Sequence, residues 1–452
     1  MKKILNNYNI KNFSYYLLLL ALSIFFYYRH VLNADEGVIL NGSWNLFNNL
    51  NLYTDFFEII PPGSFYLIYY GFKLFGPYYS VANIISLLLV WGSAIGIYKS
   101  LDLIKRNKAN FIFPLIFILS LIYLPIINHN LHNLFFLIWS VFFFLQGLKN
   151  NSNPHFFLSG LLGGLATIFL QQKGLTLISF SFLFLLVYNI KNKKIKNIII
   201  YSIGAIIPIL LLFLKWPPKL LYQNLIAFPM LTYWEVNKTS FLLLIVFFLI
   251  LVYLSIYLKN NSTIINYLLG LQFFLLLSVI PLPDFYHIVL IIFPTLILIP
   301  SLFINNQTKE TKIFILVVIT IITFSSIKYL VTSFTPFYSY SKNKSNDWIE
   351  YINKNCPGKY IYSGPFFPNL YFETKKLNVT NFDVLIEKQN TPNQFSKALN
   401  DFKKNEPSCA VLSYYENISK KFKHQGNNQL ETYIKENYTK IYSKNNIFIY
   451  KK

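Results

Sequence analysis

Long apolar stretches separated by short polar segments dominate the first 332 residues. A helix needs about 20 apolar residues to cross the hydrocarbon of a bilayer. The pattern therefore predicts about 11 membrane crossings, at 13–29, 80–98, 111–127, 132–148, 156–170, 175–190, 197–214, 240–258, 264–280, 287–304 and 313–332. The first run resembles a signal peptide, but Tyr27-Tyr28-Arg29-His30 follows it without a small-residue cleavage site, so we expect an uncleaved helix.

Basic residues indicate the orientation of these crossings. With the N-terminus inside, the inner segments carry 15 lysines and arginines and the outer segments carry 6. Basic residues concentrate on the cytoplasmic side of membrane proteins. We therefore expect a multi-pass protein of the cytoplasmic (inner) membrane, and an odd number of crossings places residues 333–452 in the extracytoplasmic or periplasmic space.

Residues 333–452 are polar and contain no spanning run, so we treat 1–332 as a transmembrane domain and 333–452 as a separate soluble one. Apolar periodicity predicts short helices and strands in alternation, and hence a small α/β domain. The expected helices are 347–355, 393–404 and 429–436, and the expected strands are 359–363, 409–415 and a closing hairpin of 440–443 with 447–450.

The first outer loop, residues 30–79, is too long to be a simple turn. Two helices are expected in it, at 38–50 and 64–75, and both are too short to span and should lie in the membrane interface. The loop also holds four carboxylates: Asp35, Glu36, Asp55 and Glu58. Acids at a membrane boundary are often functional, but spacing alone leaves open that they are solvated loop acids that balance Arg29 and Lys73.

Composition narrows the function classes. The chain is 54% hydrophobic and only 13% charged, which excludes a disordered chain and an ordinary soluble enzyme. The net charge of +22 comes almost entirely from lysine, with Arg29 and Arg106 the two arginines, and no basic run alternates with aromatics. We therefore expect no nucleic-acid partner.

The two cysteines, Cys356 and Cys409, are too few for a thiolate zinc cluster. In an oxidising compartment they could pair, but two unpaired thiols are the interpretation that we favour.

The outer loop resembles the GT-C superfamily of membrane glycosyltransferases, in the branch of dolichyl-phosphate-mannose protein mannosyltransferases and bacterial aminoarabinose transferases. The resemblance rests on the order of Asp35-Glu36, a following helix, Tyr53-x-Asp55-Phe56, Pro61-Pro62 and Lys73-Leu74-Phe75-Gly76. Weaker matches are GLLGGLATIFLQQKG at 160–174, DFYHIVLIIFP at 284–294 and YIYSGPFFPNLYFETKKLN at 360–378. Ile59-Ile60 departs from the basic residue that some bacterial members place before the proline pair.

The resemblance implies a GT-C fold and an inverting glycosyltransferase. Its partners would be a polyprenyl-phosphate-linked sugar donor, the lipid bilayer, and a glycolipid, glycan or protein acceptor. The resemblance also makes Asp35 the general base, with Glu36 organising the site or binding the acceptor, and a helix N-terminal acid as the alternative for Glu36. Asp55 and Glu58 become candidate substrate ligands. No cofactor is certain, and a divalent metal stays open.

Cations near the outer surface are candidate phosphate ligands, because the leaving group is an anionic lipid phosphate. Lys173, Lys215 and Lys219 are the candidates, against the alternative of lysines that snorkel to the interface. Asp284 and His287, three residues apart, could contact either substrate, although Asp284 could equally be a helix N-cap. His129 and His132 share this spacing, and for them a solvated loop is favoured over a metal pair.

Three other classes compete with a glycosyltransferase. A lipid or polysaccharide transporter or flippase would need charged or broken helices at mid-membrane, whereas the acids here collect in outer loops. An envelope-assembly anchor would not need the carboxylates of the first outer loop. A polysaccharide ligase or polymerase would concentrate arginines in a large outer loop, and this chain has almost none.

Overall fold

The structure is a computed structural model that describes residues 2–27, 34–122, 124–192, 195–233, 240–257, 262–304, 346–414 and 422–452. The predicted crossing at 313–332 lies outside these residues. Contacts divide the chain into two compact units, which we describe separately. The first consists of Met1–Arg29, Asn83–Trp216 and Thr239–Phe334, and the second of His30–Ala82, Pro217–Lys238 and Thr335–Lys452.

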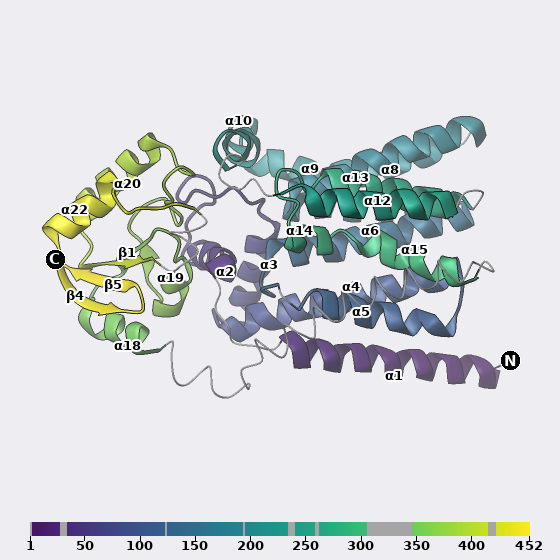
Figure 1. Cartoon of the computed structure of the whole chain (residues 1–452), viewed down its shortest axis with the longest axis horizontal. Helices are drawn as coiled ribbons and strands as arrows, with labels where there is room; N and C mark the ends of the chain where they lie inside the picture. Colours follow the sequence, from purple (N-terminus) through teal and green to yellow (C-terminus); the bar gives the residue numbers. More distant parts are fainter. Residues whose placement is uncertain are drawn as a thin grey trace. The chain divides into compact units, whose positions relative to one another are not determined.

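The first unit is a set of apolar helices that lie side by side (Figure 1). They are α1 (Lys2–Tyr27), α4 (Tyr79–Ile104, whose first residues belong to the second unit), α5 (Ile112–Ser120), α6 (His129–Asn150), α7 (Asn153–Phe169), α8 (Gln171–Asn192), α9 (Ile195–Lys215), α12 (Leu242–Tyr257), α13 (Thr263–Leu277), α14 (Phe285–Val289) and α15 (Phe293–Ile304). Among the described residues, α4, α6 and α9 are long and apolar enough to cross a membrane by themselves.

Glycine permits the tightest helix packing in this unit. A Cβ on Gly160 of α7 would lie 2.1 Å from the carbonyl oxygen of Tyr201 in α9, and one on Gly164 would lie 2.4 Å from that of Ala205. Small residues let helix backbones approach closely in membranes. The Gly-rich run at 160–164 therefore serves packing between neighbouring helices of one chain.

Two predicted crossings differ from the observed helices. Instead of 111–127, α5 contains nine residues, and at about 1.5 Å per residue it is too short to span alone. Instead of a continuous 287–304, the chain forms α14 and α15 with a break between them. Pro294 at the start of α15 lacks the N–H that would continue the first helix, which accounts for the interruption.

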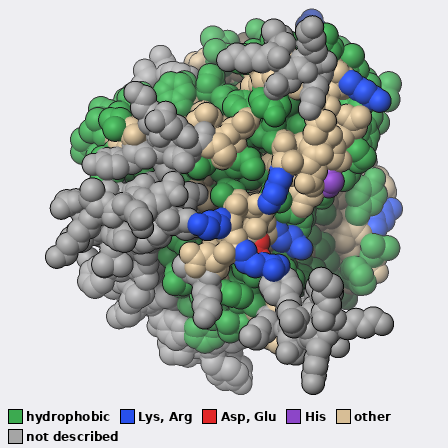
Figure 2. All heavy atoms as spheres, turned by 90° about the vertical axis from the view of Figure 1, so that its right-hand side faces the viewer, with side chains coloured by type: hydrophobic (Ala, Val, Ile, Leu, Met, Phe, Trp, Pro, Cys, Tyr) green, Lys and Arg blue, Asp and Glu red, His purple; other side chains and the backbone are tan. Residues whose placement is uncertain are grey.

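Lysine and arginine side chains gather at the end of the molecule that carries the N-terminus, with very little acidic surface around them (Figure 2). Exposed basic residues include Lys105 and Arg106, directly after α4, and Lys149, in the last turn of α6. Uneven surface charge of this kind bears on which side of the membrane this end faces, because basic residues concentrate on the cytoplasmic side.

The second unit contains a five-stranded sheet with the order β2-β1-β3-β5-β4. The strands are β1 (Tyr360–Gly364), β2 (Leu377–Asn378), β3 (Cys409–Ser413), β4 (Thr439–Lys444) and β5 (Ile447–Lys451). β1 runs parallel to β2 and β3, whereas β5 pairs antiparallel with β3, Val411 opposite Ile449, and with β4. The predicted closing hairpin at 440–443 and 447–450 is thus present as β4 and β5.

Helices cover both faces of this sheet and bury a core on each side, as in other α/β layers. On one side α20 (Pro392–Asn405) and α22 (Gln429–Asn437) contribute Phe402 and Ile434. On the other, α18 (Asn346–Asn355) and α19 (Asn369–Thr374) contribute Ile352 and Leu370. The same unit contains α2 (Ala34–Phe47), α3 (Gly63–Phe75) and α10 (Pro218–Tyr222).

Cys356 and Cys409 form a disulfide, with their Cα atoms 5.6 Å apart. The expectation of two unpaired thiols is therefore wrong. Cys356 follows α18 and Cys409 begins β3, and both side chains lie in one buried core, so folding of the sheet brings the two sulfur atoms together.

Candidate active site

Asp35 and Glu36 lie in the first turn of α2, where acidic side chains interact favourably with the positive end of the helix dipole. Their environments differ sharply. Asp35 is exposed, whereas Glu36 is 2% exposed, and its Oε2 accepts a hydrogen bond of 3.3 Å from the Tyr79 hydroxyl. The site thus presents one accessible carboxylate beside one that is anchored.

The helix that carries them is not the one-sided interfacial helix that we expected at 38–50. It starts earlier, at Ala34, and every residue from Glu36 to Leu46 is buried, including the polar Asn41, Ser43 and Asn45. It ends where Asn49 adopts a left-handed φ of 65°, a conformation that asparagine tolerates. The side chains of Asn41, Ser43 and Asn45 bond within the second unit and do not reach solvent.

Asp383, in the loop between β2 and α20, receives the buried amides of α2. Its Oδ2 accepts from Asn41 Nδ2 at 2.6 Å and from Asn45 Nδ2 at 3.4 Å, and its Oδ1 accepts from Asn378 Nδ2 at 2.8 Å. Burial raises the pKa of Asp383 to about 6, although these three hydrogen bonds act to lower it. The carboxylate is therefore largely ionised near neutral pH and can accept all three bonds.

The other two acids of the loop, Asp55 and Glu58, differ from Asp35: one closes a turn and the other is buried. Asp55 is exposed, and its Oδ2 accepts from the Asn51 backbone N–H at 2.7 Å and from Asn51 Nδ2 at 3.0 Å, which closes a turn. Glu58 is 6% exposed, and burial together with the nearby charge of Asp383 raises its pKa well above the usual value. A buried acid that keeps its proton offers little to a soluble substrate.

In the first unit, residues from three helices form a polar cluster that we call the Lys173 cluster: His129 and Asn130 of α6, Lys173 of α8, and Asp284 and His287 at the start of α14. Lys173 is 2% exposed, and its Nζ donates to Asn130 Oδ1 at 3.0 Å. Asn130 Nδ2 lies 3.0 Å from His129 Nε2. Asp284 also lies near enough for its charge to act on Lys173.

Asp284 is the N-cap of α14. Its Oδ1 accepts from the His287 backbone N–H at 3.0 Å and lies 2.7 Å from His287 Nδ1. The same oxygen, Asp284 Oδ1, caps the helix and contacts the imidazole. Asp284 can therefore cap α14 and also belong to the Lys173 cluster. Both side chains keep about a quarter of their surface exposed, at 26% and 29%.

The structure contradicts one alternative, for Lys173, and one expectation, for His132, about side-chain exposure. Lys173 does not snorkel to the interface, because it is buried in the first turn of α8 and bonded to Asn130. His132 does not belong to a solvated loop, because it is fully buried in α6 and its Nε2 lies 2.8 Å from the Ser86 hydroxyl. Asn128 is the N-cap of α6, which the sequence pattern did not indicate. His132 therefore lies inside the helix, as a buried and hydrogen-bonded residue, and not in a loop.

Lys215 and Lys219 are both exposed. Lys215 ends α9 with its Nζ 5.1 Å from the centroid of the Trp216 ring, a cation–π contact. Lys219 lies in α10 of the second unit, directly after Pro217 and Pro218.

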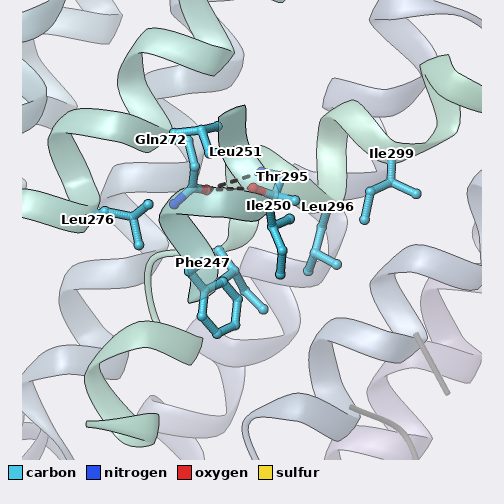
Figure 3. A pocket seen from close by; sticks show the side chains of 9 residues that line it. Phe247, Ile250, Leu251, Gln272, Leu276, Thr295, Leu296 and Ile299 are labelled. Atoms are coloured by element: carbon cyan, nitrogen blue, oxygen red, sulfur yellow. Dashed lines mark hydrogen bonds between the residues drawn. The ribbon is translucent and has the colours of Figure 1, made fainter. Parts of the chain in front are cut away.

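Among the described helices of the first unit, a small cavity and an open groove stand out. A small cavity of about 30 Å³ between α12, α13 and α15 is apolar except where Gln272 Oε1 accepts from the Thr295 hydroxyl at 2.9 Å (Figure 3). It is too small for a lipid chain. A wider, open groove of about 340 Å³ lies between α8 and α13, beginning at Leu175, two residues after Lys173, and ending at Ser278.

No group of three or more histidine, cysteine, aspartate or glutamate residues is arranged to hold a metal ion in the described part of the chain.

Comparison with known proteins supplies the family context. Residues 60–216 match the model of the family described as dolichyl-phosphate-mannose-protein mannosyltransferase. No curated protein matches the sequence significantly.

Solved structures show the fold. ArnT from Cupriavidus metallidurans bound to undecaprenyl phosphate is similar with a TM-score of 0.63 and 12% identity over 98% of both chains. The archaeal oligosaccharyltransferase AglB from Archaeoglobus fulgidus, in complex with an inhibitory peptide and a dolichol-phosphate, has a TM-score of 0.55 and 11% identity over 89% of this chain and 69% of its own. This chain therefore has the fold of these membrane proteins.

Proposed function

We propose that this chain is a membrane glycosyltransferase of the GT-C type, an inverting enzyme that moves a sugar from a polyprenyl-phosphate donor to an acceptor hydroxyl; the match of residues 60–216 to a mannosyltransferase family and the shared fold support the proposal. The transfer takes place at the outer face of the cytoplasmic membrane. The observation that carries the proposal is the exposed carboxylate of Asp35 on a helix whose remaining residues, from Glu36 to Leu46, are buried.

Asp35 acts as the general base in this proposal. Its carboxylate takes the proton of the acceptor hydroxyl while the hydroxyl oxygen forms a bond to the anomeric carbon, and the bond from that carbon to the phosphate oxygen breaks. The polyprenyl phosphate leaves with the electron pair, already as an anion, and needs no strong general acid. A single displacement inverts the anomeric configuration, in contrast to the double displacement of retaining enzymes.

Lys173 binds the donor phosphate in this proposal. An ammonium group has three protons, and Asn130 Oδ1 accepts one of them, which leaves donor capacity for phosphate oxygens. Asn130 also orients the ammonium, and the groove that starts at Leu175 offers an apolar path for the isoprenoid chain beside it. Positive charge near the bond that breaks stabilises the phosphate as it departs.

Glu36 organises the site, since its bond to Tyr79 fixes the first turn of α2 next to Asp35. We further propose that the N-terminus is inside and that the sheet of the second unit is extracytoplasmic. The basic surface around the N-terminal end of the first unit supports an inside N-terminus (Figure 2). Separately, the disulfide between Cys356 and Cys409 supports an extracytoplasmic sheet, because disulfides persist in oxidising compartments.

The proposal is tested in cells that produce the wild-type chain, the Asp35→Asn variant or no protein. Mass spectrometry of envelope glycolipids, glycans and glycoproteins should reveal one sugar that appears only with the wild type. Its target would identify the acceptor class. The control variant is Glu436→Gln, which removes one exposed negative charge in α22. No difference between wild-type cells and cells without the protein would contradict the proposal.

A further inference from the structure

The segment from Asn369 to Asp383 holds one face of α2 along its length. Besides the two amide bonds to Asp383, Trp44 Nε1 donates to the Lys376 carbonyl oxygen at 3.0 Å. Near the start of α2, a Cβ on Gly37 would lie 2.5 Å from the backbone nitrogen of Asn369, so the two backbones touch. Ten residues after the end of α2, the Phe57 N–H donates to the Asn381 carbonyl oxygen at 2.8 Å.

Directional bonds matter for this helix because burial of apolar surface alone, unlike the close contact at Gly37, does not select one rotation. A surface helix has one apolar stripe that must face inward, but α2 is buried on all sides from Glu36 to Leu46. The hydrophobic effect is non-directional and would tolerate several rotations of such a helix. A hydrogen bond weakens steeply when its angle changes, so the bonds of Asn41 and Asn45 favour one rotation.

Asn41 and Asn45 lie one turn apart, so a single carboxylate binds two successive turns of α2. The two side chains are 0% and 1% exposed, and their amide groups cannot turn to water if the acceptor is lost. Asp383 itself is 2% exposed and is held from the opposite side by Asn378. The arrangement fixes both the rotation and the axial position of α2.

We infer that Asp383 is a positioning residue for sugar transfer, which sets the place of the Asp35 carboxylate through Asn41 and Asn45. The inference rests on the proposed function of Asp35. Because helix Cα atoms lie at a radius of about 2.3 Å, a rotation of about 25° moves the Cα of Asp35 by about 1 Å. A misplacement of that size can lower a rate about 100-fold.

The first test replaces Asp383 by asparagine, which keeps the shape of the side chain but turns one acceptor oxygen into an N–H donor. With the undecaprenyl-phosphate hexose or pentose that gives the fastest wild-type turnover, we expect kcat of Asp383→Asn to fall about 30- to 100-fold. The donor KM should stay within about twofold, because Lys173 is unchanged. Glu436→Gln, which makes the same chemical change at an exposed site of the same unit, should keep wild-type kcat.

A second variant tests the bond itself. The exchange Asn41→Asp with Asp383→Asn reverses the direction of one hydrogen bond and restores it, and we expect kcat to recover at least fivefold over Asp383→Asn alone. If Asp383→Asn does not accumulate in the membrane, Asn45→Ala removes only the 3.4 Å bond and should lower kcat about threefold to tenfold.

Hydrogen exchange of α2 amides gives a readout that does not depend on activity. Amides of α2 should exchange at least tenfold faster in Asp383→Asn than in the wild type, while those of α22 should be unchanged. A normal kcat and normal exchange in Asp383→Asn would overturn the inference and leave the role of Asp35 intact. Faster exchange in a chain that transfers no sugar would contradict the proposed function and leave the anchoring of α2 intact.

Discussion

Both candidate regions bury polar side chains, but they assemble them in different ways. The Lys173 cluster is built at the ends of apolar helices, where the chain leaves one helix and enters the next, and its members lie beside recognisable turns. The α2 region joins residues more than 300 positions apart, as in the bond from Asn41 to Asp383. Local sequence therefore predicts the residues of the Lys173 cluster, whereas the α2 region forms only when the sheet of the second unit folds.

This difference predicts that the α2 region is more sensitive to the folding of residues 346–452 than the Lys173 cluster is. Substitutions in one region should therefore leave the other region unchanged, and the largest free-energy change is expected in the second unit.

Removal of the disulfide should have the largest effect on stability. The double substitution Cys356→Ser with Cys409→Ser removes a cross-link between residues 53 positions apart. The chain-entropy relation predicts that the free energy of unfolding falls by about 4 kcal/mol. Pulse proteolysis of the detergent-solubilised protein in urea would show earlier cleavage within 346–452. Cleavage between α6 and α9 should be unchanged, and equal destabilisation of both regions would contradict the comparison.

Acidification should stabilise the second unit through Asp383. Between pH 3.8 and about 6 the folded chain keeps a proton on Asp383 that the unfolded chain has released. The folded state then binds more protons, so stability falls as pH rises through this window and increases by about 3 kcal/mol as pH falls through it. The pKa of Glu58 shifts in the same direction, and burial together with the charge of Asp383 raises the pKa of Tyr371.

The difference between the wild type and Asp383→Asn isolates this contribution, since asparagine does not titrate. Urea unfolding at pH 4.5 and pH 7 should show the pH effect in the wild type beyond that of the variant. The same pH dependence in both proteins would show that Asp383 is not buried as described.

Loss of the Lys173 ammonium should weaken donor binding without disturbing α2. A charged hydrogen bond contributes about 1.5–3 kcal/mol, so Lys173→Met should raise the donor KM about 100-fold and leave hydrogen exchange of α2 unchanged. Lys149→Met is the matched control, because its exposed Nζ donates to the Leu103 carbonyl oxygen outside the cluster. A donor KM that matches this control would remove Lys173 from the phosphate site.

A methyl group on Gly37 should have the opposite pattern of effects, because it should disturb α2 and leave donor binding unchanged. The Cβ would lie 2.5 Å from the backbone nitrogen of Asn369, which cannot move aside cheaply, and such overpacking costs about 1–3 kcal/mol. We expect Gly37→Ala to lower kcat and to accelerate exchange in α2, with donor binding unchanged.

Gly42→Ala is the internal control for this substitution. Its Cβ would meet the ring of Phe65, a side chain that can shift, and so the effect should be smaller. A larger loss in Gly42→Ala than in Gly37→Ala would indicate that α3, and not α19, positions α2.

The sequence predicted features that depend on nearby residues. The loop acids, the apolar helices and the hairpin of β4 and β5 follow from local pattern and turn chemistry. The order of short motifs around Asp35 and Pro61-Pro62 gave the resemblance to GT-C glycosyltransferases, and residues 60–216 match a mannosyltransferase family.

Features that depend on tertiary contacts were missed. Asn41 and Asn45 look like the polar side of an interfacial helix, and nothing near them in sequence reveals the carboxylate of Asp383. The pairing of Cys356 with Cys409 also depends on the register of β3 beside α18. Asn130 was missed because its role appears only when α8 brings Lys173 against α6.

The most direct test of the central claim is single-turnover transfer by Asp35→Asn from a radiolabelled undecaprenyl-phosphate sugar, with donor binding measured on the same preparation. General-base catalysis contributes about 10²–10⁴-fold, so the account predicts a rate at least 100-fold below the wild type with donor affinity within about twofold. Transfer within threefold of the wild-type rate would contradict the assignment of Asp35 as the base.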